Sequence, residues 1–235
     1  MNYINTITNL LGKHEQLNMI VTNLEIQRRN PNRLNLYLDN VFCCGVSLNI
    51  VAKYKLFNEK PIDGETVDMI LFDTLYERVL DRVVQYLSSY RKTERQAKDY
   101  IKQLLYKKKG DWFSKDLLLD EDKIISKIMK FIKENGLVND KIYAQEFING
   151  RITNKPRSLY LIRSELIGKG IDQEIVDEVL SNDNTNELND EQLIVNLCRK
   201  KYGTDKIDKE DRKKIAFFQR KGFSWDVISC ILSDD

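Results

Sequence analysis

The chain has 235 residues, of which 42% are hydrophobic and 31% are charged, a composition that excludes disorder as its dominant state. The formal net charge is +2, so affinity for nucleic acid must come from charges segregated along the chain rather than from overall basicity. The 10 glycines and 3 prolines favour helices joined by short loops over a β-sandwich or a β-barrel.

The N-terminal residues 1–19 are predicted to form a mobile segment. Residues 1–16 lack the basic stretch and apolar core of a signal peptide, and the chain has no apolar run of ~18 residues that could span a membrane. We therefore expect a cytoplasmic protein with reduced thiols and no association with membranes.

The four cysteines do not form a metal-binding pattern. Cys43 and Cys44 are adjacent, Cys198 and Cys230 lie in apolar helical patterns, and the sequence has no CxxC pair. Because His14 is the single histidine, too few ligands are available for a zinc site. We expect neither a metal nor a cofactor.

Residues 20–65 are predicted to form a small β-rich module. Leucine occupies every second position from 34 to 38, and this period of two is typical of a half-buried strand. Residues 1–70 contain seven basic and seven acidic side chains, so this part has no electrostatic bias toward DNA. We predict a three-stranded meander with strands at 20–27, 34–38 and 41–46 and turns at 29–32 and 39–40.

The chain after Gly64 is predicted to be helical. Apolar residues keep a four-residue rhythm between positions 71 and 83, as on one face of a helix. Thr93 and Gln96 have the spacing of a capping box at the start of the next helix. Further helix starts are predicted at Asn139, Asn189, Asp208 and Ser224, and Pro156 is expected in a first helical turn.

An internal repeat indicates how the helices are organised. Residues 166–180 align with residues 218–232 at an offset of 52, and in both copies a helix is expected to end at a glycine, Gly170 or Gly222, followed by a short helix. A third copy lies upstream at an offset of 51, with a C-cap glycine at Gly136 after its last helix. The linker 110–119 within this copy is longer and contains Trp112 and Phe113.

The predicted fold is therefore mostly α. Three tandem three-helix repeats, each too small to bury its apolar face alone, would stack into an elongated array after the small N-terminal β-meander. The expected divisions are a segment at 1–19, the β-rich module at 20–65, and repeats at 66–136, 137–186 and 187–235.

Catalytic motifs are missing from the sequence. It contains no GxSxG, P-loop, HExxH or glycine-rich dinucleotide-binding turn, so we expect no enzymatic activity. The carboxylates of Glu174, Asp177 and Glu178 are interpreted as the solvent face of a helix.

Charge is unevenly distributed along the helical part. Residues 91–109 hold eight basic and two acidic side chains, and residues 199–221 hold ten basic and four acidic ones. Residues 170–198 hold eight acidic side chains and neither lysine nor arginine. Such segregation suits binding to a polyanion or to a protein of complementary charge, although each cluster could also be an ordinary hydrated helix face.

The aromatic residues are interpreted mainly as core. Trp112, beside the lysines at 107–109, is a candidate surface contact, whereas Trp225 is expected to pack against the preceding helix. Core positions are predicted for Tyr143, Phe147, Tyr160, Phe217 and Phe218.

Three motifs resemble those of the RecX regulatory proteins, in the same order along the chain. They are residues 86–94 (YLSSYRKTE), 136–144 (GLVNDKIYA) and 218–224 (FQRKGFS). The resemblance extends from about residue 20 to the C-terminus, because longer members of the family also begin with a β-rich extension.

The resemblance implies a monomer of three tandem three-helix repeats that binds RecA and its filament on single-stranded DNA. It also implies inhibition of strand exchange and of the filament-dependent ATPase, in homologous recombination, DNA repair and the SOS response, with weak direct binding to DNA. Basic faces would lie in the filament groove and acidic faces would contact RecA. The candidate binding residues are Arg91, Lys92, Lys107, Lys108, Lys109, Arg151, Lys155, Arg157, Arg163, Arg199, Lys200, Lys201, Lys213, Lys214, Arg220 and Lys221.

Other functions fit the same sequence. A stand-alone helical nucleic-acid-binding module would bind bare DNA or RNA tightly with a steep salt dependence. A scaffold for another protein would show neither DNA binding nor an effect on RecA. A hydrolase that uses carboxylates alone would turn over nucleic-acid substrates.

Overall fold

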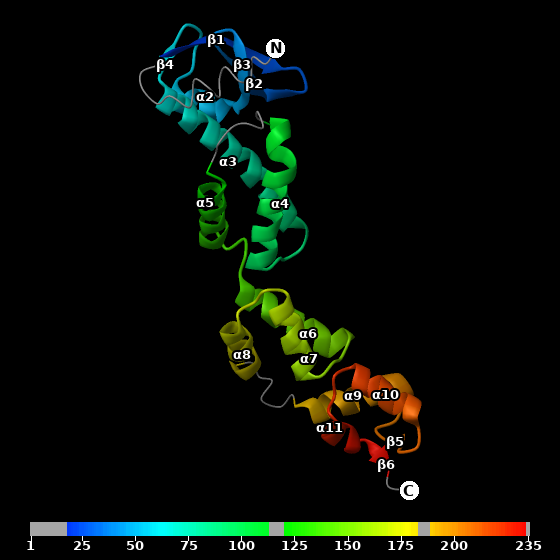
Figure 1. The fold of residues 1–235 in the computed structure, drawn as a ribbon. Helices are drawn as coiled ribbons and strands as arrows, with labels where there is room; N and C mark the ends of the chain where they lie inside the picture. The colour runs from blue at the N-terminus through cyan, green and yellow to red at the C-terminus, as the bar shows by residue number, and fades with distance from the viewer. Residues whose placement is uncertain (1–17, 113–119, 183–188, 234–235) are drawn as a thin grey trace. The chain divides into compact units, whose positions relative to one another are not determined.

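The computed structural model describes residues 18–112, 120–182 and 189–233, and it leaves the side chains of 108–112 and 182 undescribed. Within these ranges it contains ten helices and six short or medium strands (Figure 1). The mostly α fold with an N-terminal antiparallel sheet is confirmed. The predicted mobile segment, apart from its last two residues, and the linker residues 113–119 lie outside the described ranges.

The chain divides into two compact units. Unit 1 comprises the residues up to 90 together with 98–137, and unit 2 comprises 91–97 together with the residues from 138 onward. The boundaries of the three predicted repeats remain a prediction.

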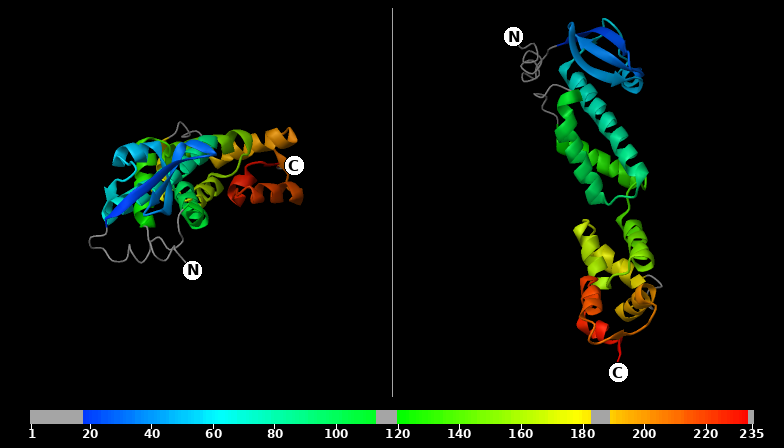
Figure 2. Two further views of the ribbon diagram at one scale, coloured as in Figure 1. Left: turned by 90° about the horizontal axis from the view of Figure 1, so that it is seen from above. Right: turned by 90° about the vertical axis from the view of Figure 1, so that its right-hand side faces the viewer.

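Unit 1 begins with a curled four-stranded antiparallel sheet in the order β3-β2-β1-β4 (Figure 2). The predicted meander corresponds to β1 (Met19–Gln27), β2 (Asn30–Leu38) and β3 (Val41–Ser47). Helix α2 (Leu48–Tyr54) and strand β4 (Pro61–Ile62), which pairs with β1, were not predicted. Val21, Leu36 and Val46 are fully buried, so the sheet has one apolar face.

The predicted turn at 29–32 was wrong. The turn consists of residues 28 and 29, and β2 already begins at Asn30. The register jumps from Gln27 opposite Asn30 to Ile26 opposite Leu34, so the intervening residues bulge out of the β1–β2 ladder. Pro31, which has no N–H to donate, lies in this bulge. The second predicted turn is confirmed, with left-handed φ angles of 47° at Asp39 and 68° at Asn40.

Three helices follow β4 along the chain: α3 (Gly64–Ser89), α4 (Glu94–Trp112) and α5 (Glu121–Glu134). The predicted capping box starts α4, because the Thr93 N–H donates to Gln96 Oε1 at 3.1 Å and the Gln96 N–H donates to Thr93 Oγ1 at 3.2 Å. Helix α4 runs on to Trp112, so the expected linker at 110–119 was placed three residues too early.

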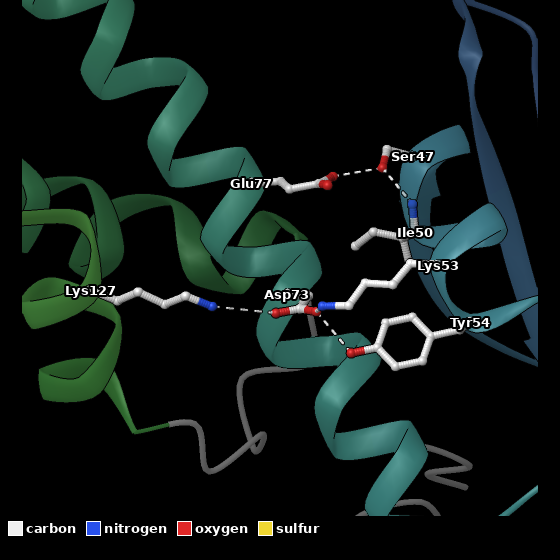
Figure 3. Close-up of polar contacts among 7 residues, drawn as sticks. All are labelled: Ser47, Ile50, Lys53, Tyr54, Asp73, Glu77 and Lys127. Carbon is white, nitrogen blue, oxygen red and sulfur yellow. Dashed lines mark hydrogen bonds and ion pairs between the residues drawn. The ribbon is translucent and has the colours of Figure 1, made fainter. Parts of the chain in front are cut away.

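Asp73 on α3 connects three elements of unit 1 (Figure 3). Its carboxylate forms an ion pair with Lys53, accepts a hydrogen bond from the Tyr54 hydroxyl at 2.8 Å, and lies 3.7 Å from Lys127 Nζ on α5. Burial alone would raise the pKa of Asp73, but the hydrogen bonds from Lys53 and Tyr54 and the nearby ammonium groups outweigh it and lower that pKa. The carboxylate therefore stabilises the contacts of α3 with α2 and α5.

Unit 2 contains two groups of three helices, each with its own core (Figure 2). The first group is α6 (Asp140–Asn154), α7 (Leu159–Gly168) and α8 (Gln173–Asn182), which bury Ile148, Leu166 and Val176. The second group is α9 (Asp190–Tyr202), α10 (Arg212–Arg220) and α11 (Trp225–Ser229), which bury Leu197, Phe218 and Ile228.

The second group also contains strands that were not predicted. Strand β5 (Ile207–Asp208) pairs in parallel with β6 (Leu232–Ser233). The expected helix over residues 225–232 was therefore wrong in its second half, since α11 ends at Ser229 and the chain then turns into β6.

Most predicted helix starts are confirmed. The side chains of Asn139, Asn189 and Ser224 accept hydrogen bonds from the third residue after each, as N-caps do. The start at Asp208 was wrong, because that residue lies in β5 and Asp211 is the N-cap of α10. The first-turn position of Pro156 was also wrong, because Ser158 is the N-cap of α7.

Two similar sets of hydrogen bonds occur in this chain, each where a Lys–Gly turn contacts the first turn of a helix that comes earlier in the sequence. In the first joint, the Thr93 hydroxyl donates to the Lys169 carbonyl at 3.0 Å, and the Glu94 N–H donates to Asp140 Oδ1 at 2.8 Å. Gly170 has a φ of +85°, and a Cβ there would lie 2.6 Å from the Cβ of Arg95. The first turn of α4 is thus held by a carbonyl and a carboxylate from the α6–α8 group.

The second joint repeats this geometry in the next pair of helical groups. The Ser158 N–H donates to the Lys221 carbonyl at 3.0 Å, and the Leu159 N–H donates to Asp190 Oδ1 at 2.7 Å. Gly222 has a φ of +88°, and a Cβ there would lie 2.5 Å from Ser158 Oγ. Together with φ of +65° at Gly136, these angles confirm the predicted left-handed helix ends.

Candidate nucleic-acid interface

One face of α6 carries aromatic rings that make cation–π contacts with basic side chains. Tyr143, Phe147 and Arg151 follow one another at four-residue spacing, so they lie along one side of the helix. The Arg151 guanidinium lies 4.7 Å from the Phe147 ring centroid, and Lys169 Nζ lies 5.5 Å from the same centroid. The ring faces therefore hold two cations close to the protein surface.

Phe217 on α10 has the same role in the second group. Lys201 Nζ lies 3.5 Å from the Phe217 ring centroid, and Lys221 Nζ lies 5.5 Å from it. Lys201 comes from the last turn of α9 and Lys221 from the C-terminal end of α10, so one ring brings together cations from two helices.

These positive charges converge on Lys221. Burial lowers the pKa of Lys221, and the positive charges of Arg157, Lys201, Arg151 and Lys155 lower it further. We define the basic cluster as these residues together with Lys169, which shares the Phe147 ring with Arg151; its members are Arg151, Lys155, Arg157, Lys169, Lys201 and Lys221. They come from the end of α6, the segment before α7, the C-terminal end of α7, and helices α9 and α10. An approaching phosphate would relieve this mutual repulsion.

Glu165 on α7 fixes the two arginines of the basic cluster. Its carboxylate is 2.8 Å from Arg151 Nε and forms an ion pair with Arg157. All three side chains are less than one-third exposed, at 24%, 30% and 18% for Arg151, Arg157 and Glu165. The carboxylate thus bridges the two guanidinium groups through one oxygen each, which orients them and leaves the set with a net positive charge.

Some predicted binding residues form ion pairs within the protein instead. Arg91 Nε lies 2.8 Å from Glu146 Oε1, and Arg163 pairs with Asp177. Arg199 is held by both oxygens of Asp205, at 2.7 and 2.6 Å. Lys214 Nζ lies 3.1 Å from Asp211 Oδ2 and also 5.3 Å from the Tyr202 ring. These carboxylates offset much of the positive charge at those positions.

The remaining predicted residues occupy different places. Lys200 Nζ donates to the Thr153 carbonyl at 3.1 Å, at the edge of the basic cluster. Lys107 is exposed on α4 in unit 1, whereas the side chains of Lys108 and Lys109 lie outside the described ones. Lys92 is half-buried in unit 2, and Lys213 and Arg220 are exposed on α10.

The aromatic predictions are partly confirmed. Phe218 is fully buried, and Tyr143, Phe147 and Phe217 are half-buried. The core position of Tyr160 was wrong, because its side chain is 75% exposed at the start of α7, and Trp225 is 55% exposed. The side chain of Trp112 lies outside the described ones.

Lys169 and Glu165 were not predicted from the sequence as site residues. Lys169 could have been found, because it precedes Gly170 as Lys221 precedes Gly222 in the internal repeat. Glu165 carries no comparable signal, since its role depends on α7 packing against the end of α6.

Within the part of the chain that the structure describes, no group of three or more His, Cys, Asp or Glu side chains is placed to hold a metal ion. No helix within the described ranges is both long enough and apolar enough to cross a membrane.

Comparison with known protein families gives three matches in chain order. Residues 19–63 match the regulatory protein RecX N-terminal domain, residues 139–180 match the RecX second three-helix domain, and residues 189–232 match the RecX third three-helix domain. The chain belongs to the RecX family. The two matched helical domains of this RecX chain are the α6–α8 and α9–α11 groups that contribute the basic cluster.

Relatives over nearly the whole length agree with this assignment. The regulatory protein RecX of Clostridioides difficile (strain 630) is 27% identical over 222 residues, which cover 91% of this chain and 94% of the relative. The RecX of Clostridium perfringens (strain 13 / Type A) is 28% identical over 217 residues, covering 90% and 94%. A crystal structure of a regulatory protein RecX shares the fold, with a TM-score of 0.59, 22% identity and coverage of 91% and 98%. A regulatory role therefore follows for this chain.

Proposed function

We propose that this RecX protein binds RecA on single-stranded DNA and inhibits strand exchange and the filament-dependent ATPase. The observation that carries the proposal is the basic cluster, in which cations from two consecutive three-helix domains surround Lys221. A cluster of this kind suits contact with a phosphate backbone that is already organised by another protein.

The proposed mechanism needs no chemistry by this chain. The basic cluster would contact phosphates of the DNA in the filament, and acidic surfaces such as that of Glu174 on α8 would contact RecA. Occupation of the groove would exclude a second DNA strand and hinder the subunit rearrangements that accompany ATP turnover. Inhibition would then be a consequence of binding alone.

The lysines that lie over the Phe217 ring are better suited to contact phosphates than to recognise bases. Lys201 and Lys221 have point-like ammonium groups held over Phe217, which is half-buried and so presents little free ring surface to a base. Binding should therefore be independent of DNA sequence and sensitive to salt.

The test is the single-stranded-DNA-dependent ATPase rate of the cognate RecA as this protein is titrated in. We expect the rate to fall at amounts below one protein per RecA subunit. The double variant Lys201→Glu and Lys221→Glu should need at least about tenfold more protein for the same inhibition, because two phosphate contacts become repulsive.

The matched control is Lys98→Glu with Lys102→Glu, which reverses the same number of charges at exposed positions of α4. Both variants should retain the helical circular dichroism spectrum of the parent. An unchanged ATPase rate at saturating protein would reject RecA regulation, and tight binding to bare DNA in that case would favour the stand-alone nucleic-acid-binding module.

A further inference from the structure

A polar pocket of about 400 Å³ lies in unit 1, and none of its lining residues belongs to the basic cluster. One wall is the β1–β2 hairpin, which contributes Arg33, and the other is a face of α3, which contributes Arg78, Asp81 and Arg82. Arg78 and Arg82 are four residues apart, so they lie on the same side of the helix. The volume falls within the range of small-ligand sites.

Two of the arginines are held side by side despite their equal charge. Arg33 donates to the Gly45 carbonyl through Nη2, and Arg78 donates to the same oxygen through its own Nη2 at 3.3 Å. Burial lowers the pKa of Arg33, and burial together with the positive charge of Arg33 lowers the pKa of Arg78 to about 10. Both guanidinium groups stay charged at neutral pH, and a bound anion would relieve their repulsion.

The two arginines pack closely against Gly45 in the wall of the pocket. A Cβ at Gly45 would lie 2.4 Å from Gln27 Nε2 and 2.9 Å from Arg78 Nη2, so glycine leaves room for both side-chain ends in their present positions. The Gln27 amide is oriented by a 2.8 Å hydrogen bond to Asn35 Oδ1. Among the residues that the structure describes, none accepts a hydrogen bond from the buried Nε of Arg33.

We propose that this pocket binds a phosphomonoester. The Glu77 carboxylate also acts on Arg33, but it lies outside the lining and accepts a hydrogen bond from the Ser47 hydroxyl. The lining itself has three guanidinium groups against the single carboxylate of Asp81, an excess that matches the charge of about −1.5 to −2 on a phosphomonoester at neutral pH. A carboxylate or a phosphodiester would neutralise only half of this excess. Arginine also donates paired N–H groups in the geometry that phosphate oxygens accept.

The rest of the lining indicates what the phosphate is attached to. The side-chain amides of Gln27, Asn30 and Gln85 offer donors and acceptors suited to sugar hydroxyls or the edge of a base. The ligand class is therefore a nucleoside monophosphate group, supplied either by a free mononucleotide or by the 5′-phosphorylated end of a DNA strand. The site is independent of the proposed role of the basic cluster, since none of its residues belongs to that cluster.

The experiment is isothermal titration calorimetry of the full chain with three probes: AMP, a 5′-phosphorylated trinucleotide and the same trinucleotide with a 5′-hydroxyl. We expect the phosphorylated probes to bind more tightly than the hydroxyl probe. Arg82→Gln, at an exposed position of the rim, should raise their Kd about tenfold. Arg28→Gln removes the same charge from the exposed β1–β2 turn, outside the pocket lining, and should leave the Kd unchanged.

The outcomes distinguish a free nucleotide from a DNA end as the ligand, and both from other occupants of the pocket. Binding of AMP alone supports a free nucleotide as the ligand, and binding of both phosphorylated probes supports a DNA end as well. Equal binding of the two trinucleotides without binding of AMP would overturn the proposal, as would a Kd that Arg82→Gln leaves unchanged. Displacement of AMP by an Asp- and Glu-rich peptide at equal concentration would identify an acidic protein segment as the occupant instead.

Discussion

The two Lys–Gly joints share their hydrogen-bond acceptors but differ in the donor to the lysine carbonyl, which is the Thr93 hydroxyl at the first joint and the Ser158 N–H at the second. At both joints the lysine carbonyl accepts a hydrogen bond from an N-cap residue, and an aspartate accepts one from the next N–H. At the second joint, however, the positive charges of four side chains act on Lys221 and lower its pKa, as burial does. The comparison indicates that the joint is a structural unit on which surface charge varies independently.

The largest effect is expected from filling the glycine positions. Gly222→Ala should lower the free energy of unfolding by about 2–4 kcal/mol, because a left-handed φ and a clash with buried Ser158 act together. Gly170→Ala should cost about as much, since the new Cβ would lie 2.6 Å from the Cβ of Arg95, which the α4 backbone holds in place. Urea denaturation followed by circular dichroism measures both losses.

Gly136→Ala is the matched control for these substitutions. Gly136 has a left-handed φ of +65°, but nothing lies within 4 Å of an added Cβ, so only the backbone strain of about 1–2 kcal/mol is expected. Equal losses for all three variants would mean that the turns are not closely packed against the earlier helices.

An intermediate effect is expected from removing the two lysines in turn. Lys221→Ala should reduce by about 0.7 the slope of log Kd against log salt concentration for single-stranded DNA, because the proposed contact with one phosphate would be lost. Lys169→Ala should reduce it less, since Lys169 lies at the Phe147 end of the basic cluster. Fluorescence anisotropy of labelled DNA measures the slopes, and equal slopes for the two variants would remove the functional distinction between the joints.

The smallest effect concerns the aspartate of the second joint. Burial raises the pKa of Asp190 despite the hydrogen bond from the Leu159 N–H. A raised carboxyl pKa favours the folded state below the ordinary value near 3.8, and this contribution is lost as the pH rises through the folded-state pKa. Asp190→Asn keeps an acceptor oxygen and removes the charge. The free energy of unfolding of this variant, compared with that of the parent at the same pH, should therefore become larger as the pH rises from 3 to 7.

The expected gain is a few tenths of a kcal/mol, because solvent screens a carboxylate that is only half-buried. Urea denaturation at several pH values measures it. Asp226→Asn makes the same substitution at an exposed position of α11 and is the control. Parallel curves for Asp190→Asn and the parent would show that burial of this carboxylate has no cost.

Local features of the fold were predictable from the sequence, whereas contacts between distant segments were not. Asn139, Asn189 and Gly222 act within a few residues of themselves, so side-chain type and spacing sufficed to place helix ends there. Strand β4 and helix α2 depend on tertiary contacts, and two-residue strands such as β5 have no periodicity to detect.

The candidate site was predictable as a set of residues but not as a surface. Runs such as 199–201 suggested one basic face, yet Arg199 pairs with Asp205 whereas Lys201 lies over Phe217. Lys155 and Lys221 are far apart in the sequence, although helix packing brings their charges together. Charge density in sequence therefore overestimates the contribution of lysines and arginines that have acidic partners.

The pairing of β5 with β6 also bears on the order in which the chain folds. The Ile207 N–H donates to the Ile231 carbonyl at 2.8 Å, and Ile207 lies opposite Leu232 in the parallel pair. During synthesis the α9–α10 connection thus stays open until residues 231–233 have left the ribosome. Lys201, a member of the basic cluster, lies on α9 just before that connection, so its final position relative to α10 is reached only after the end of this domain has been synthesised.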